Sequence, residues 1–489
     1  MPETRQAIPS AYNTINSNRC VGYEMGTALA DIVDNSISAH ATKVDIFAFP
    51  NPLSIAICDN GTGMDQEGLD NAMTFGGKGN TFQRSPEDLG RFGLGLKTAS
   101  LSQCRQLTVI TKKDGVVLGG RWDMDYLENH NEWNYLIVPE EECRQEVSRS
   151  PLSNYASGTL VIWKKFDTLE DSATNVQASF AKQTELARKH LELVFHRYLS
   201  GEENLSKISM AWNKRLLEPN DPFLTGKVGE VSPPIPLHYN NSTIIVIPHK
   251  LPYPSQAKKE TKSRELADLA LGKTLLETQG FYIYRNKRLI SWGSWFRLAP
   301  KLDRTKLLRI QVDIPNSLDS YWHLDIKKST AFPPDAIRQQ LKNILDHHEE
   351  FSVRTFKRRI SQQTKSQVPY WNRVTSPDGA VEYTINKMHP LVQELSSALP
   401  DNKKWIVSSL LDDLSTFFPV ASLQADLQGD ASIKNEDTVD SYQEEAIWKK
   451  IDIYLSLGYD LDKIKEISPI SDYLEYFETY MLQKGQTNG

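Results

Sequence analysis

The sequence lacks the features that mark membrane-spanning, secreted and zinc-stabilised proteins. It has no run of about 18 apolar residues, so no membrane span is expected. Residues 1–10 have no apolar core of the kind that a secretory signal needs. The four cysteines form no C-x-x-C pair and the ten histidines never occur at H-E-x-x-H spacing, which argues against a disulfide scaffold and a structural zinc site. These absences predict a cytoplasmic protein.

Composition and charge then limit the classes of partner. The 489 residues are 39% hydrophobic and 24% charged, an ordinary globular balance, and this length predicts about three domains. The net charge is -6, but residues 371–489 hold 10 basic and 20 acidic residues, which leaves +4 for the rest. A nucleic-acid surface is therefore expected in residues 1–370, and a protein-binding surface in the acidic remainder.

Hydrophobic periodicity gives a coarse secondary structure for the first part of the chain. Apolar residues at helical spacing predict a helix over 20–39, followed by strands over 43–49 and 53–58. Residues 60–92, which are rich in Gly, Asn, Ser and charge, are interpreted as a long loop. Further strands are expected at 107–111, 116–122, 135–138 and 159–166, and a helix at about 177–199.

The rest of the chain divides into a strand-rich and a helical part. Strand and turn signals alternate over about 205–335, and a helix is expected from about 335 to 366. Past residue 369 the pattern is helical and acidic, with a polar loop at about 424–441. No repeat of 20 to 50 residues occurs.

Two glycine clusters are weak signals when each is taken alone. Asp59-Asn60-Gly61-Thr62-Gly63-Met64 follows a predicted strand and would also suit an ordinary turn. Gly90-Arg91-Phe92-Gly93-Leu94-Gly95-Leu96-Lys97-Thr98 nearly matches a P-loop. However, it has an extra Leu96 and follows a polar loop where a P-loop follows a strand.

The order of four segments is more specific than any one of them. Asp31-Ile32-Val33-Asp34-Asn35 on a helix precedes the Asp59 turn, the Gly90 cluster and Thr159 at the start of a strand. This order resembles the GHKL ATPases (gyrase B, heat-shock chaperone ATPases, histidine kinases and MutL), and the motifs are most similar to MutL, MORC proteins and their bacterial relatives. The resemblance covers about residues 10–170 and, less strongly, 205–335.

The resemblance implies an α+β fold in four parts. An N-terminal strap (1–20) would precede a GHKL α/β sandwich ATPase domain (21–200). A transducer domain of the ribosomal S5-like α/β type (201–368) and an acidic α-helical C-terminal domain (369–489) would follow.

The resemblance also implies roles for the helix residues. Asn35 would hold Mg²⁺, and Asp31, four residues earlier on the same helix face, would be the general base. Most of the family has Glu at that position, and Asp is one methylene shorter, so its carboxylate lies about 1 Å farther from the water. Slow or partner-gated hydrolysis is therefore expected. Glu24 is an alternative base, whereas Asp34 points about 100° away from Asn35 and is expected to cap or orient its neighbours.

By the same resemblance, further residues would bind ATP. Asp59 would accept the adenine amino group, with Gly61 and Gly63 allowing close approach and Thr159 bonding to Asp59 or a water. A helix beginning around Gly93 and Gly95 would favour phosphate, with Lys97 and more weakly Arg91 adding charge. The full set of expected nucleotide-binding residues is Asn35, Asp59, Gly61, Gly63, Met64, Gly90, Arg91, Gly93, Leu94, Gly95, Lys97 and Thr159.

The second domain would supply a switch lysine. Residues 280–290 resemble the strand-turn-strand of the MutL and MORC transducer, and residues 324–332 resemble the loop whose lysine contacts the γ-phosphate. Lys327 takes that position, with Lys328 next to it; alternatively the pair are solvated lysines before a Pro-Pro turn.

The function that this resemblance implies is an ATP-driven clamp. The chain would form a homodimer on binding ATP and act on double-stranded DNA without strong sequence preference, with a role in bacterial anti-phage defence. Basic clusters at 258–264 and 354–359 are candidates for phosphate contacts, or ordinary solvated faces. The alternative is a chaperone-like ATPase or ATP sensor whose region 369–489 binds a partner effector protein.

Overall fold

The computed structural model divides into two compact units, Met1–Lys301 with Thr305–His348, and Leu302–Arg304 with Glu349–Gly489. The structure describes residues 9–19, 22–76, 95–172, 174–202, 205–225, 230–251, 274–302, 305–322, 332–348, 368–375, 381–417, 440–467, 470–472 and 474–486.

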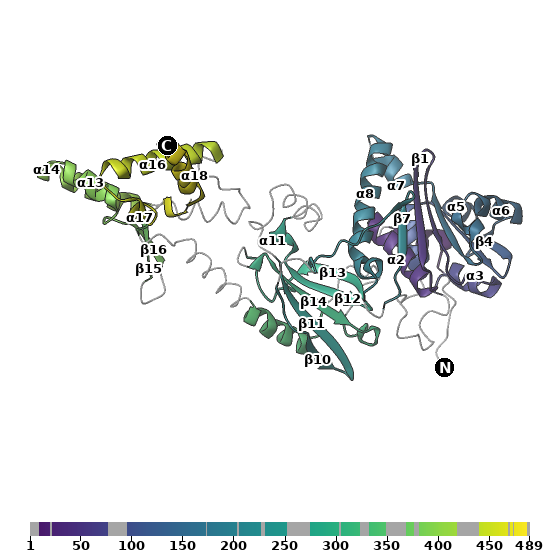
Figure 1. Cartoon of the computed structure of the whole chain (residues 1–489). Helices are drawn as coiled ribbons and strands as arrows, with labels where there is room; N and C mark the ends of the chain where they lie inside the picture. The colour runs from purple at the N-terminus through teal and green to yellow at the C-terminus, as the bar shows by residue number, and fades with distance from the viewer. Residues whose placement is uncertain are drawn as a thin grey trace. The chain divides into compact units, whose positions relative to one another are not determined.

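The first unit begins with a mixed sheet of eight strands (Figure 1). Their order across the sheet is β5-β4-β3-β6-β2-β1-β7-β8, and every neighbouring pair is antiparallel except β1 and β7. The strands are β1 (Lys43–Pro50), β2 (Leu53–Asp59), β3 (Gln106–Lys113), β4 (Val116–Asp123), β5 (Leu136–Ile137), β6 (Gly158–Lys164), β7 (Ser209–Trp212) and β8 (Arg215–Leu216). The predicted strands at 43–49 and 53–58 are confirmed.

Alternation along the strands provides two apolar faces, and helices cover both. On one face α2 (Met25–Ser38), α4 (Gly95–Gln103) and α8 (Val176–Val194) pack around a core that includes Leu29 and Ile57. On the other, α6 (Glu140–Ser148) and the short helix η1 (Pro151–Asn154) pack on side chains such as Cys58. The predicted helix over 20–39 is thus observed as α2, with its apolar residues toward the sheet.

The prediction of a continuous loop over 60–92 was wrong at one place, because the helix α3 (Gln66–Met73) lies within that range. The Asp65 side chain accepts a hydrogen bond from the Gly68 amide at 2.9 Å and so caps this helix. Leu69 and Met73, four residues apart, are buried on its inner side. The helix is only eight residues long, too short for its periodicity to be clear within a polar, glycine-rich stretch.

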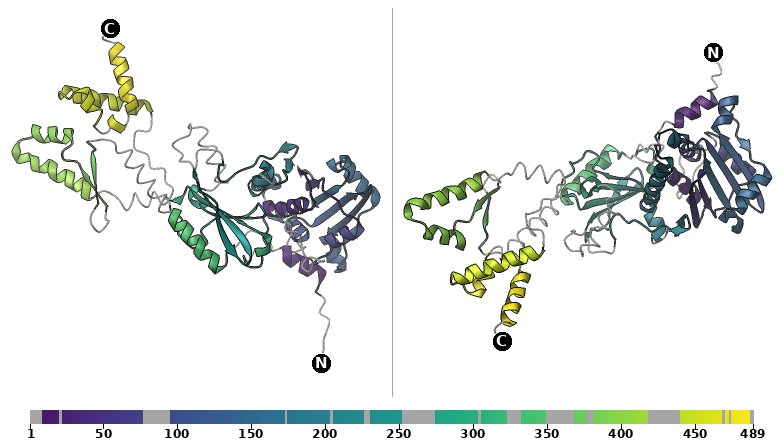
Figure 2. Two further views of the ribbon diagram at one scale, coloured as in Figure 1. Left: turned by 60° about the horizontal axis from the view of Figure 1, so that its bottom comes forward. Right: turned by 90° about the horizontal axis from the view of Figure 1, so that it is seen from above.

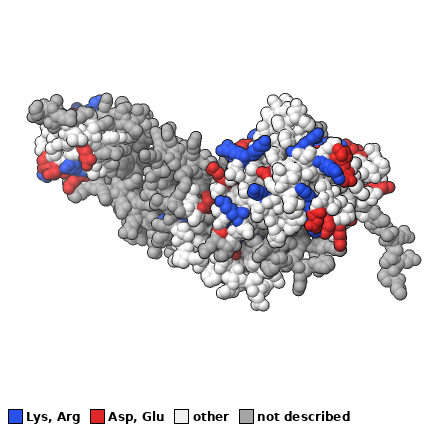
Figure 3. Space-filling model, turned by 45° about the vertical axis from the view of Figure 1, so that its right-hand side comes forward, with Lys and Arg blue, Asp and Glu red and all other residues white. Residues whose placement is uncertain are grey.

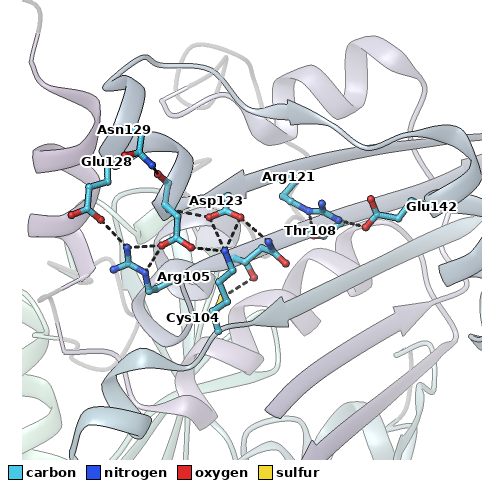
Figure 4. Close-up of polar contacts among 11 residues, drawn as sticks. Cys104, Arg105, Thr108, Arg121, Asp123, Glu128, Asn129 and Glu142 are labelled. Carbon is cyan, nitrogen blue, oxygen red and sulfur yellow. Dashed lines mark hydrogen bonds and ion pairs between the residues drawn. The ribbon is translucent and has the colours of Figure 1, made fainter. Parts of the chain in front are cut away.

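Polar contacts connect α5 (Met124–His130) and α6 to the sheet, as Figure 4 shows. Arg105 on the loop before β3 pairs with Glu128 of α5 at 3.1 Å. Arg121 of β4 lies between Thr108, which accepts at 2.9 Å, and Glu142 of α6. α5 in turn contacts α1 (Ala11–Arg19), which packs on α4.

A second sheet, with strand order β10-β11-β14-β12-β13, follows in the same unit (Figure 2). A helix over 335–348 packs against it through Ile337, Leu341 and Leu345. β12 and β13 form a hairpin, and β12 pairs in parallel with β14. The elements of this part are β9 (Glu230–Val231), β10 (Ile235–Tyr239), β11 (Ser242–Lys250), α11 (Leu275–Thr278), β12 (Gly280–Arg285), β13 (Arg288–Ser294), β14 (Leu308–Ile314) and η4 (Asn316–Leu318), whereas α7 (Asp167–Ser172) and α9 (His196–Ser200) pack with α8 on the first sheet.

The second unit contains a hairpin besides the expected helices. β-branched residues around a Ser-Pro-Asp-Gly turn sequence favour strands, and β15 pairs antiparallel with β16. Its elements are β15 (Trp371–Thr375), β16 (Val381–Ile385), α13 (Pro390–Ala398), α14 (Asp401–Thr416), α16 (Asp440–Ser456), α17 (Leu461–Ile464), η5 (Ile470–Asp472) and α18 (Leu474–Gln486). Among the described residues of the whole chain, none of the helices combines the length and apolar character required to cross a bilayer.

Candidate active site

Helix α2 carries an exposed amide beside two buried carboxylates. Asn35 is exposed, whereas Asp31 is 3% and Asp34 is 1% exposed. Asp31 and Asn35 are one turn apart and share a side of the helix, as predicted. The same helix therefore presents a buried carboxylate at Asp31 and a solvent-accessible amide oxygen at Asn35.

The Asp31 carboxylate borders the start of α4. Its Oδ2 atom accepts a hydrogen bond from the Tyr23 hydroxyl at 3.1 Å. A Cβ atom at Gly95, the first residue of α4, would lie 3.7 Å from the same oxygen. The helix expected around Gly93 and Gly95 is observed as α4 from Gly95, and the positive end of its dipole lies beside the buried acid.

Asp34 and Asp31 both face an arginine from the second sheet. Arg288 at the start of β13 donates from Nε to Asp34 Oδ1 at 3.1 Å, and its Nη2 lies 3.8 Å from Asp31 Oδ1. Asp34 was expected to cap or orient neighbours, and the structure pairs it with this cation.

Asp59 at the end of β2 is a buried carboxylate that accepts three hydrogen bonds. Its Oδ1 accepts from the backbone amides of Gly61 at 2.9 Å and Thr159 at 3.2 Å, and its Oδ2 accepts from the Ser36 hydroxyl at 3.0 Å. Burial raises the pKa of Asp59 above its ordinary value, and these donors oppose that rise. Thr159 thus reaches Asp59 with its backbone rather than with its side chain.

The turn after Asp59 requires glycine at two positions. Gly63 has a φ of +64°, and a Cβ there would lie 2.2 Å from the Lys112 carbonyl oxygen. A Cβ at Gly61 would lie 2.8 Å from the Ala39 carbonyl oxygen. The next residue, Met64, is half-buried and donates its amide to the Thr111 hydroxyl at 2.7 Å. These contacts hold the turn against β3.

Lys97 on α4 is turned toward α3 in this structure. Its Nζ donates to the carbonyl oxygen of Ala72, near the C-terminal end of α3, at 2.7 Å and lies 5.7 Å from the centre of the Phe75 ring. Burial lowers its pKa to about 8. The predicted phosphate contact therefore requires this side chain to leave the α3 carbonyl.

The remaining predicted residues fall outside the described part of the chain. These are Gly90, Arg91, Gly93 and Leu94 in the glycine cluster, and Lys327 with Lys328 in the second domain. Among the described residues, no group of three or more His, Cys, Asp or Glu could hold a metal ion. The exposed Asn35 amide fits Mg²⁺ in another way, since this ion takes few protein ligands when phosphate oxygens and waters supply the others.

Glu24, the alternative base, lies apart from Asp31 and lines a cavity. It precedes α2, is exposed and makes no side-chain cap contact with the helix. It lines a cavity of about 510 Å³ together with Gln103, His190 and Trp292, and Asp31 is not among the lining residues. The geometry therefore favours Asp31 as the base.

Three residues of the site were missed from the sequence. Ser36 is a polar residue four positions after Ile32 on the buried side of α2, and that position was a usable signal. Tyr23 lies just before α2 and belongs to no recognisable motif. Arg288 is 254 residues from Asp34 and no local pattern relates the two.

Comparison with known proteins identifies the domain that holds this site. Residues 23–159 match the family described as histidine kinase-, DNA gyrase B-, and HSP90-like ATPase. The chain is 34% identical over 97 residues to ATPase MORC2B of Mus musculus, which covers 18% of this chain and 9% of that protein. It is 30% identical over 129 residues to ATPase morc-1 of Caenorhabditis elegans (26% and 15%) and 27% identical over 209 residues to ATPase MORC2A of Mus musculus (40% and 18%). The chain spans less than a fifth of the length of each of these relatives. Residues 23–159 thus match a GHKL-type ATPase domain, and part of the chain is similar to MORC ATPases.

Proposed function

We propose that this chain binds Mg²⁺–ATP and hydrolyses it to ADP and phosphate at the site on α2. The observation that carries the proposal is the Asp31 carboxylate, buried one turn from the exposed Asn35 amide and bordered by the first residue of α4. A helix N-terminus favours phosphate, and a neighbouring carboxylate can take a proton from the attacking water.

Asp59 would recognise the adenine. An ionised carboxylate has about four acceptor positions. Three are used by the Gly61 and Thr159 amides and the Ser36 hydroxyl, so Oδ2 retains one for the exocyclic amino group. A guanine base would present an oxygen at that position, which would repel the carboxylate. ATP is therefore favoured over GTP.

The residues of α2 divide the chemistry between them. Asn35 would hold the cation, which when bound neutralises phosphate charge. Asp31 would orient the water and accept its proton, and the Tyr23 hydroxyl keeps its carboxylate in place. Lys327 is proposed as the switch lysine that reaches the γ-phosphate, by resemblance to the MutL and MORC transducer.

Two α2 variants and a matched control test this function. Asn35→Ala should lose Mg²⁺-dependent ATP binding, whereas Asp31→Asn, which keeps size and loses the base, should bind ATP and lose turnover by about 100-fold or more. Asn129→Ala removes an exposed helical asparagine elsewhere in the domain and should behave as wild type. Turnover that survives Asp31→Asn would contradict the assignment of the base.

We further propose that the ATP-bound chain forms a homodimeric clamp on double-stranded DNA, in the cytoplasm and in anti-phage defence. The resemblance to MutL and MORC proteins supports this proposal. On the face drawn in Figure 3, the described Lys and Arg side chains are interspersed with Asp and Glu rather than joined into one stripe. Binding without sequence preference should then be weak and fall steeply between about 50 and 200 mM salt, which fluorescence anisotropy with a labelled duplex would measure.

A surface on α14 favours the second candidate, a partner-binding ATPase or sensor. Ile406, Leu410, Leu414 and Phe417 recur at helical spacing and are 49%, 56%, 50% and 78% exposed. Such an apolar stripe suits a protein partner better than DNA. DNA binding that is absent at all salt concentrations, with ATP binding intact, would select this candidate.

A further inference from the structure

We infer that Arg288 is a positioning residue that links the second sheet to the base of the ATPase domain. The inference rests on the proposed hydrolysis of ATP. In this view Arg288 sets the orientation of the Asp31 carboxylate, so the rate of hydrolysis depends on how the β12–β13 hairpin lies against α2.

The contact is buried on both sides. The side chains of Arg288, Asp31 and Asp34 are at most 4% exposed. The Nε atom makes a hydrogen bond to Asp34, while the buried Nη2 atom makes none with the described residues and lies 3.8 Å from Asp31 Oδ1. A shift of about 1 Å toward Asp31 would give Nη2 a normal hydrogen bond. A small movement of Arg288 toward α2 would therefore complete the contact with Asp31.

The hairpin that carries Arg288 contacts α9. Asn286 and Lys287 both have positive φ, as a two-residue hairpin turn requires, and place Arg288 at the start of β13. The Tyr198 hydroxyl of α9 donates to the Asn286 carbonyl oxygen at 2.7 Å. Close by, the His196 ring lies 2.8 Å from the Tyr284 hydroxyl. These contacts position the backbone from which the Arg288 side chain extends.

Other groups around Arg288 suit a buried cation shared by two acids. The Phe195 ring centre lies 5.7 Å from its guanidinium carbon. His190 adds no competing positive charge, because burial and the nearby Arg288 lower its pKa to about 3 and keep the ring neutral. Removing one partner of such a buried set leaves an uncompensated charge, so movement of the hairpin and movement of α2 are energetically coupled.

Arginine is needed for this role because its planar fork can face two carboxylates at once. A lysine has one compact ammonium group and would satisfy Asp34 or Asp31 but not both. With the ammonium on Asp34, the Asp31 carboxylate would lose the cation beside its Oδ1 atom and could rotate. A misplacement of about 1 Å at a reacting group can cost about 100-fold in rate.

The test compares Arg288→Lys with Arg285→Lys in the full chain. Arg285 is equally buried on the paired strand and forms two 2.7 Å hydrogen bonds with Asp319, so it is a matched control. In Arg288→Lys we expect an ATP dissociation constant within about threefold of wild type and a single-turnover rate about 10- to 100-fold lower. Arg285→Lys should keep the wild-type rate. Asp34→Asn, which removes the 3.1 Å partner without touching Asp31, should lower the rate in the same way.

Different results would overturn the inference and the proposed function. A wild-type single-turnover rate in Arg288→Lys, or an equal loss in Arg285→Lys, would overturn the positioning role. If wild type binds ATP without hydrolysing it, the proposed function fails. In that case hydrogen exchange tests whether Arg288 links β13 to α2. ATP should change the exchange of peptides from both α2 and β13 in wild type, but only of peptides from α2 in Arg288→Lys. A change confined to α2 in wild type would overturn the link.

Discussion

Replacement of Lys97 by methionine should change the pH dependence of stability in a defined direction. Burial lowers the pKa of this ammonium from 10.5 to about 8. The unfolded chain therefore holds the proton at pH values where the folded chain has released it, and stability rises with pH between about 8 and 10.5. The cost of burying the charged form is fully present below about pH 8.

The size of this effect follows from the pKa difference. A shift from 10.5 to about 8 corresponds to about 3 kcal/mol, since one pKa unit is about 1.4 kcal/mol. Lys97→Met has no such group, so wild type should gain about 3 kcal/mol on the variant between about pH 7 and 10.5. In a domain of this size that is about 6–12 °C in melting temperature.

Thermal unfolding of both proteins at about pH 7, 8, 9 and 10 measures the difference, in which other titrating groups cancel. Lys113→Met is the control, because Lys113 is only half-buried, its contact with Asp65 raises its pKa, and its contribution to stability is lost only above pH 10.5. A difference between wild type and Lys97→Met that stays constant or falls with pH would refute the argument that this ammonium is desolvated.

Two further substitutions test the surroundings of Asp59 and the turn that follows it. Gly63→Ala should lower the melting temperature by clearly more than Gly76→Ala does. Both glycines have positive φ, which costs an alanine about 1–2 kcal/mol of stability. Only at Gly63 would the new Cβ also meet a backbone atom, the Lys112 carbonyl oxygen. Equal losses in differential scanning calorimetry would contradict the close approach of the Lys112 carbonyl to Gly63. Ser36→Ala removes a donor that opposes the raised pKa of Asp59, so calorimetric ATP affinity should fall by about fivefold at neutral pH and its loss on acidification should begin at a higher pH than in wild type. Unchanged acid dependence would exclude the Asp59 carboxylate from nucleotide binding.

Local periodicity explains why much of the fold could be predicted. The apolar spacing of α2 and the alternation in β1 and β2 are strong, short-range signals. Both strands were placed to within one residue, whereas α2 begins at Met25, five residues later than predicted. The start of a helix at Gly95 also followed from the motif order. Lys97 shows the limit: its position on α4 was anticipated, but the Ala72 carbonyl that it binds lies in a helix for which the sequence predicts a loop.

The part of the site that could not be predicted from the sequence depends on long-range contacts. Arg288 precedes two apolar strand residues and gives no local indication of a buried partner. Its pairing with Asp34 depends on the path of the intervening chain through two sheets. Such a contact is fixed by tertiary topology and has no period or spacing from which it could be predicted.

The pairing of β7 with β1 has a consequence for where this ATPase domain ends. β7 pairs in parallel with β1, and the Ser209 amide donates to the Thr42 carbonyl oxygen at 2.9 Å. The family match stops at residue 159, some fifty residues before this strand. A fragment cut after α9 would leave the hydrogen-bonding groups along one side of β1 without their partners and invite pairing between molecules. The family match is therefore shorter than the sheet that it belongs to, and the chain must be synthesised past Leu216 before all eight strands are present.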